Sequence, residues 1–234
     1  MDAGANRVLA RTSSGGIRWS RIPWRTIIAL AFILPASISF VLPFYWMFIS
    51  SLKTKDDVWA WPIVWFPRPL LWQNYAEAWN EFPFTRLYIN TADLTVMRLL
   101  GTFLSCTVVA YAFARLRAPG KGILFMVLLS TLMLPRQVTL IPQFLIWHHV
   151  GALDTYWPLV VPTFFGNAFF IFLLRQFFMS IPPQLGEAAK IDGCSEFGIL
   201  WRVYLPLSIP ALATVAIFSF QSSWGDFFDP MIYI

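Results

Sequence analysis

The sequence predicts an all-α integral membrane protein with five transmembrane helices. Only 12% of the 234 residues are charged, against roughly 25% in soluble domains. Hydrophobic residues make up 58% of the chain. Three uncharged runs, over residues 26–52, 155–174 and 203–225, each reach the length of about 20 residues that a helix needs to cross a bilayer. This composition indicates that lipid surrounds most of the chain.

Two weaker apolar stretches bring the number of predicted spans to five. Residues 99–114 carry no charge, and residues 122–153 carry only that of Arg136. The first apolar run, over residues 26–52, is longer than the 7–15 residues of a signal-peptide core, and no small-residue cleavage site follows it. We therefore expect an uncleaved first span rather than a secretory signal.

The distribution of basic residues predicts a cytoplasmic N-terminus. Five arginines precede the first span: Arg7, Arg11, Arg18, Arg21 and Arg25. By the positive-inside rule these residues stay in the cytoplasm. Residues 1–25 are thus expected to form a basic cytoplasmic tail, and residues 26–234 the transmembrane domain. The net charge is +5, but the basic residues lie at span ends rather than on one face, so no nucleic-acid partner is expected.

The first span contains Pro35 and Pro43, which kink a membrane helix without preventing it. Residues 53–90 form an external loop, whose tryptophans are expected at the membrane–water boundary. The second span covers residues 91–114. Its charged residues Asp93 and Arg98 are expected near the outer surface.

Turns rich in proline and glycine separate the later elements. An inner turn with a Pro-Gly pair leads into the third span, whose helix is broken by Pro135 and Pro142. Residues 151–158 form the next outer turn. The fourth span ends at Arg175, and the fifth begins near Pro206.

A mixed-charge segment between the fourth and fifth spans predicts a helix–turn–helix on the inner surface. Prolines after Ser180 start the first helix, which ends near Asp192, and Gly193 suits a left-handed turn. An apolar stripe marks the second helix and comprises Phe197, Leu200, Trp201 and Tyr204. The pair Leu205-Pro206 then turns the chain into the fifth span. The residues alone fit either an ordinary polar loop or a docking element for another subunit.

The same segment resembles the cytoplasmic signature of ATP-binding-cassette (ABC) importer permeases, E-A-A-x3-G-x9-I-x-L-P. The matching residues are Glu187, Ala188, Ala189, Gly193, Leu205 and Pro206. The single departure is Val203, where the signature has Ile. The stretches LPFYWMFISSLKT, NYAEAW, LPRQVTLIPQF and SWGDFFDP are similar to the carbohydrate-uptake, maltose-type branch. The resemblance covers about residues 26–234.

This resemblance implies a permease subunit for ATP-driven, binding-protein-dependent sugar import in a bacterial cell membrane. Its implied partners are a second homologous permease, an ABC ATPase dimer that holds ATP and Mg²⁺, and an extracytoplasmic solute-binding protein. The chain itself then binds no cofactor. The resemblance implies that coupling to the ATPase involves Glu187, Ala188, Ala189, Lys190, Asp192, Gly193, Leu205 and Pro206. The branch usually has six spans, so we expect that truncation accounts for the missing sixth.

Four residues are candidates for contact with the solute: Arg136, Asn167, Trp224 and Asp226. A charge within the membrane is costly and usually faces a cavity, which favours Arg136, although this side chain could also snorkel to the outer interface. The other three could instead mediate contacts between helices.

No arrangement of residues predicts an enzyme. The phosphate-binding pattern GxxxxGK[ST] is absent from the sequence. Adjacent His148 and His149 point apart on a helix, so no metal site is expected, and Cys106 and Cys194 predict no disulfide. Two alternatives remain. One is a permease for a non-sugar solute such as a phosphorylated polyol; the other is a secondary transporter without an ATPase, which would need midplane ionisable residues and inverted repeats.

Overall fold

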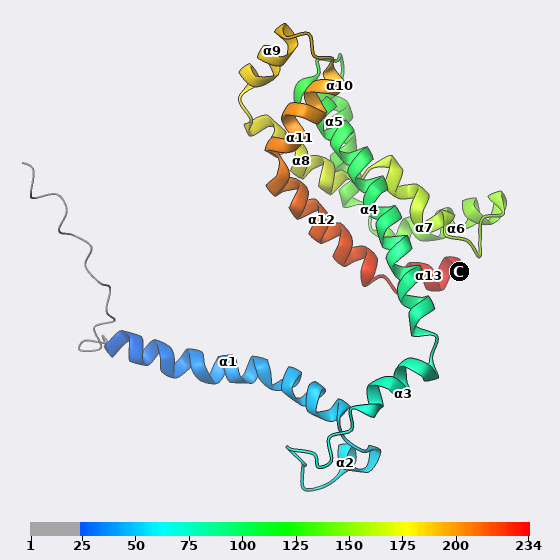
Figure 1. The fold of residues 1–234 in the computed structure, drawn as a ribbon. Coiled ribbons are helices and arrows are strands. Elements are labelled where there is room, and N and C mark those ends of the chain that lie inside the picture. The colour runs from blue at the N-terminus through cyan, green and yellow to red at the C-terminus, as the bar shows by residue number, and fades with distance from the viewer. Residues whose placement is uncertain (1–23) are drawn as a thin grey trace, which may run out of the picture. The chain divides into compact units, whose positions relative to one another are not determined.

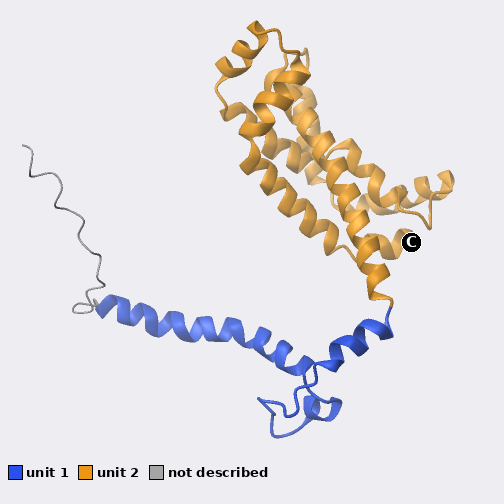
Figure 2. Ribbon diagram, in the orientation of Figure 1, with its two compact units in different colours: residues 1–82 blue, residues 83–234 orange. Residues whose placement is uncertain are grey.

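A computed structural model describes residues 24–234, and every regular element in that part of the chain is a helix (Figure 1). This agrees with the predicted all-α fold. The chain divides into two compact units, residues 1–82 and residues 83–234 (Figure 2). The predicted tail of residues 1–25 lies outside the described residues, except for its last two residues, which belong to the first helix.

The first unit contains one long apolar helix and the loop that follows it. Its helices are α1 (Trp24–Ser51), α2 (Lys55–Trp59) and α3 (Gln73–Glu81). The loop folds back on the end of α1, because the side-chain amide of Asn74 donates 2.9 Å hydrogen bonds to the carbonyls of Ser51 and Lys53. Trp59 and Trp61 are each 88% exposed. Their expected place at the membrane boundary stays a prediction.

The second unit is a helical bundle around one long helix, α4 (Phe84–Arg115), which contacts α8, α12 and η3. The other elements are α5 (Lys121–Ser130), η2 (Thr131–Met133), α6 (Arg136–Val150), α7 (Trp157–Val160), η3 (Val161–Phe165), α8 (Ala168–Ser180), α9 (Pro183–Ile191), α10 (Glu196–Ile199), the π-helix η4 (Leu200–Tyr204), α11 (Leu205–Leu207), α12 (Ile209–Trp224) and α13 (Phe228–Tyr233). The best-buried side chains of this bundle come from α4, α8, η4 and α12, and include Cys106, Leu174, Phe178, Tyr204 and Val215.

Three stretches are long and apolar enough to cross a membrane: residues Trp24–Ser51, Phe84–Arg115 and Trp157–Ser180. Two bent pairs of helices bring the number to five if each pair is one span. The pair Lys121–Met133 and Arg136–Val150 is bent by 99°, and the pair Glu196–Leu207 and Ile209–Trp224 by 82°. The first bend adjoins Pro135, as predicted, because proline cannot continue the hydrogen-bond ladder of a helix. The predicted break at Pro142 is wrong, since Pro142 lies inside the continuous helix α6.

The predicted end of the fourth span is wrong. The fourth span continues past Arg175 to Ser180. The charge is accommodated there because Arg175 Nε donates a 3.3 Å hydrogen bond to the carbonyl of Phe113, and its guanidinium lies 4.1 Å from the centre of the Phe125 ring. As predicted, the helix direction changes near Pro206: Pro206 lies in the first turn of α11, and α12 begins at Ile209.

Candidate functional site

The segment with the E-A-A signature forms the predicted helix, α9, at one end of the second unit (Figure 1). The chain leaves α9 through Gly193, whose φ of +83° is the left-handed conformation expected there. The amide of Cys194 donates a 2.9 Å hydrogen bond to the carbonyl of Ala189, which closes the helix end. Glu187 and Ala188 are exposed. The structure thus brings most of the predicted coupling residues onto one short, accessible helix and the turn that ends it.

The predicted apolar stripe of the second helix is wrong. Leu200 and Tyr204 are each 2% exposed, but Phe197 and Trp201 are 62% and 47% exposed. The reason is the π-helix η4, whose i→i+5 hydrogen bonds rotate the side chains away from the regular helical register. Ile199 takes the buried place instead. Leu205 and Pro206 lie in α11, and the chain turns after them, at Ser208.

Tyr204 is the residue through which this segment is fixed to the bundle. Its ring centre lies 5.2 Å from that of Tyr111 on α4 and 5.9 Å from that of Phe178 on α8, and both pairs meet edge to face. The guanidinium of Arg115, at the end of α4, lies 5.1 Å from the centre of the same ring. Sequence analysis missed Tyr111 and Arg115. A tyrosine within an otherwise apolar span was the available signal.

Polar contacts connect the same elements. The hydroxyl of Tyr111 donates a 2.8 Å hydrogen bond to Glu196 Oε2, and Glu196 forms an ion pair with Lys190 of α9. The hydrogen bond from Lys190, and next that from Tyr111, hold the pKa of the Glu196 carboxyl below its ordinary value. Arg115 donates hydrogen bonds to the carbonyls of Phe178 and Ile181 at the end of α8. Lys190 is therefore joined through Glu196 to the central helix α4.

A second group of polar residues surrounds two adjoining cavities of about 350 and 650 Å³ toward the other end of the unit. Two ion pairs line them. Arg98 of α4 lies 2.8 Å from Asp226, and Arg136 at the start of α6 pairs with Asp229 of α13. We call the combined space the polar cavity; both parts share Arg98, Arg136, Asn167 and Ser222.

Three of the four predicted solute-contact residues line the polar cavity: Arg136, Asn167 and Asp226. Asn167 has a structural task as well, because its side-chain oxygen accepts hydrogen bonds from the amides of Phe169 and Phe170 and so caps α8. Trp224 does not line the cavity; its ring stacks on Phe220 at 5.4 Å.

Sequence analysis missed Asp229 and the inward role of Arg98. Asp93 is exposed near the start of α4, whereas Arg98 is largely buried in its ion pair.

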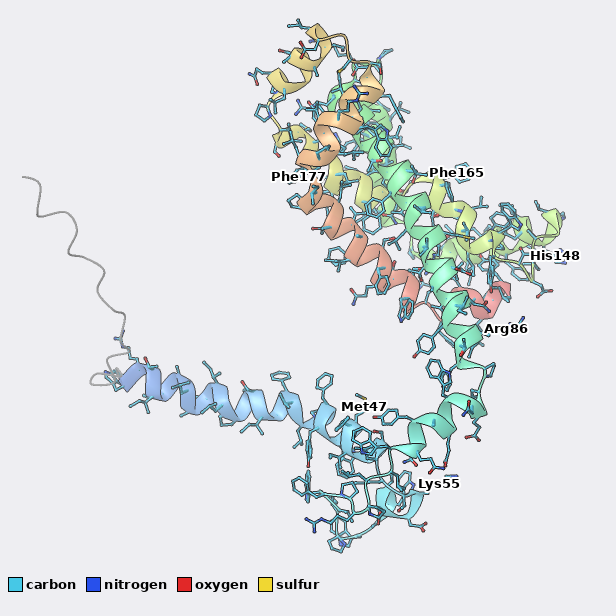
Figure 3. The ribbon with its side chains drawn as sticks, in the orientation of Figure 1. Met47, Lys55, Arg86, His148, Phe165 and Phe177 are labelled. Atoms are coloured by element: carbon cyan, nitrogen blue, oxygen red, sulfur yellow. The ribbon has the colours of Figure 1, made fainter. Side chains whose placement is uncertain are left out.

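Within residues 24–234, no three potential metal ligands of the His, Cys, Asp or Glu type lie together. His148, on α6, lies far from α9 in the second unit (Figure 3).

Known proteins similar to this chain are membrane transport components. The probable ABC transporter permease YurM of Bacillus subtilis is 34% identical over 202 residues, which are 84% of this chain but only 65% of YurM. The chain thus spans less than two thirds of that relative. The sn-glycerol-3-phosphate transport system permease UgpE of Yersinia pestis is 31% identical over 198 residues, covering 82% of this chain and 70% of UgpE.

A solved structure has the same fold. It is a crystal structure of a bacterial ABC transporter involved in the import of the acidic polysaccharide alginate, and it matches with a TM-score of 0.82 and 27% identity. The match covers 90% of this chain and 74% of the chain in that structure. Residues 17–229 match the family described as the binding-protein-dependent transport system inner membrane component. The chain therefore belongs to the family of inner membrane components of binding-protein-dependent transport systems.

Proposed function

We propose that this chain is a permease subunit of an ATP-driven, binding-protein-dependent carbohydrate importer. It forms half of a translocation pathway with a second, homologous permease in a bacterial cell membrane, with its N-terminus in the cytoplasm. An ABC ATPase dimer supplies ATP and Mg²⁺, and an extracytoplasmic solute-binding protein delivers the carbohydrate. Family membership and the alginate-importer fold support this proposal over a secondary transporter.

The observation that carries the proposal is the construction of α9. Its exposed side presents Glu187 and Ala188, a small surface that another protein can approach closely. The opposite side is fixed to the bundle through buried Tyr204. A helix held in this way moves together with the membrane helices when a partner displaces it, which is what the transfer of work from an ATPase requires.

Each remaining coupling residue has a task in this proposal. Ala189 is half-buried and keeps α9 close to the residues beneath it. Asp192 and Gly193 end the helix, and the left-handed backbone of Gly193 sets the direction of the chain toward α10. Leu205 and Pro206 form the short α11, which passes movement on to α12.

The polar cavity suits a solute with many hydroxyl groups. Arg136, Asn167 and Asp226 offer hydrogen-bond donors and acceptors at its wall. Both cavity arginines have an aspartate partner, so the two pairs add no net charge. This pairing favours an uncharged carbohydrate over a phosphorylated polyol, which would seek an unpaired cation. The likeness to UgpE is the finding that favours the phosphorylated solute.

The test is to express the chain with the transport subunits encoded beside it. We expect an ABC ATPase to co-purify with it, and we expect Glu187→Arg to abolish this association. Glu77→Arg, an exposed glutamate of α3, serves as the matched control. Uptake of radiolabelled maltose and of sn-glycerol-3-phosphate then separates the two solute classes. A complex of the expressed subunits that contains no ATPase would refute the proposal.

A further inference from the structure

We infer that Tyr111, Tyr204 and Arg115 are positioning residues that form a joint, through which displacement of α9 reaches α4 and α8. This inference rests on the proposed function, since it needs a partner that displaces α9. It goes further by naming the side chains of the bundle that receive the movement.

The first contact of the joint lies directly beside the E-A-A signature. A Cβ atom added to Gly186 would lie 3.2 Å from the hydroxyl oxygen of Tyr204, closer than ordinary van der Waals contact. The absence of a side chain at Gly186 therefore lets α9 rest on the end of the Tyr204 side chain. Because Tyr204 is 2% exposed and surrounded by packed rings, it has little room to yield when α9 moves.

The second contact is polar and reaches α4. Lys190 of α9 pairs with Glu196, and Glu196 accepts the hydrogen bond from the Tyr111 hydroxyl. The ion pair alone is weak, because the two side chains are 61% and 40% exposed and water screens them. Tyr111 is only 5% exposed, so water screens its hydrogen bond to Glu196 less than it screens the ion pair. This hydrogen bond fixes the position of Glu196 relative to α4.

The third contact joins α4 to α8. The last carbonyls of a helix have no partners within the helix, and Arg115 supplies partners for two carbonyls at the end of α8, those of Phe178 and Ile181. Its guanidinium also lies over the Tyr204 ring. Tyr204 belongs to the π-helix η4, a type of local irregularity that is frequent at functional sites. Movement of Tyr204 therefore acts on α4 and α8 together.

Hydrogen–deuterium exchange of the complete complex tests the joint with ATP as the probe, so no solute needs to be known. The complex of the co-expressed subunits is compared without nucleotide and with Mg-ATP plus vanadate. We expect nucleotide to change exchange in α9 and also in residues 107–115 of α4. In Tyr111→Phe, which keeps the ring and loses only the hydroxyl, the change in α9 should remain. The effect of nucleotide on hydrogen exchange in residues 107–115 should fall by roughly tenfold in this variant. This factor corresponds to the free energy of one hydrogen bond to a charged group.

Two further variants keep the test decisive. Glu196→Gln keeps an acceptor for Tyr111 but removes the ion pair with Lys190, and it should weaken the transfer less than Tyr111→Phe. Tyr156→Phe, at an exposed tyrosine just before α7, should leave the nucleotide response of α9 and that of residues 107–115 unchanged. A purely structural role for Tyr111 would alter exchange without nucleotide and leave the nucleotide response in α4 intact.

The outcomes separate this inference from the proposed function. If nucleotide leaves α9 unchanged in the unmodified complex, the proposed coupling itself is refuted. If α9 responds and residues 107–115 respond equally in the unmodified complex and in Tyr111→Phe, the joint is refuted while the coupling stands.

Discussion

The guanidinium of Arg98 lies 2.8 Å from the carboxylate of Asp226, although 128 positions separate the two residues in the sequence. Their side chains are 15% and 8% exposed, so the pair is largely withdrawn from solvent. It ties the central helix α4 to the chain that follows α12. Asp226 also accepts a 3.2 Å hydrogen bond from the amide of Asp229, which positions the second ion pair of the polar cavity.

Replacing one partner of this ion pair should lower the free energy of unfolding more than replacing both partners. Asp226→Leu alone leaves Arg98 buried without its partner, and we expect a loss of about 3–5 kcal/mol in the free energy of unfolding. The double variant Arg98→Met, Asp226→Leu should recover much of that loss. Thermal unfolding in detergent measures both, with exposed Asp93→Leu as the control. Equal losses in the single and double variants would contradict a stabilising pair.

Gly193→Ala should disturb the end of α9. At φ +83° a side chain strains the backbone, at a cost of about 1–2 kcal/mol. We expect faster hydrogen exchange in α9 and weaker association with the ATPase. Gly122→Ala is the matched control, because a Cβ there meets nothing within 4 Å and its φ is not positive. An unchanged complex in both variants would show that the turn tolerates side chains.

The contact between α4 and η3 should reject even one methyl group. A Cβ atom at Gly101 would lie 2.2 Å from Thr163 Oγ1 and 2.8 Å from the Phe164 ring. Gly101→Ala should therefore lower the free energy of unfolding by about 1–3 kcal/mol through overpacking, which a lower Tm in detergent would reveal. Thr163→Ala in the same chain removes the hydroxyl that the new Cβ atom would meet, so it should recover part of the loss. An unchanged Tm in Gly101→Ala would contradict this reasoning.

The contact of Glu196 with α9 should weaken at low pH. The pKa of Glu196 lies below its ordinary value of 4.5 in the folded chain, so its contribution is complete above that value. It is lost as the pH falls through the lowered folded pKa. Exchange in α9, corrected for its intrinsic pH dependence, should therefore stay constant from neutral pH to about 5 and rise below that range. Glu196→Gln should remove the rise; a rise at neutral pH would contradict the assignment.

The spans and the α9 helix could be predicted because their signals are local. The apolar length of residues 26–52 requires a membrane helix whatever surrounds it, and α1 forms there. Gly193 ends α9 as predicted, because the left-handed conformation is a property of one residue. The stripe through Phe197 and Trp201 failed because a regular helical period was assumed, and η4 departs from that period.

The sequence by itself determined that this protein is helical, lies in lipid and carries the E-A-A signature, since composition, length and spacing are written along one stretch of chain. Only the tertiary structure decided that Arg98 meets Asp226 and that Arg136 meets Asp229. It also decided that Tyr111 and Arg115 receive Tyr204. The physical reason is that these contacts join helices far apart in the chain, and packing of the whole bundle selects which charged or aromatic side chains meet.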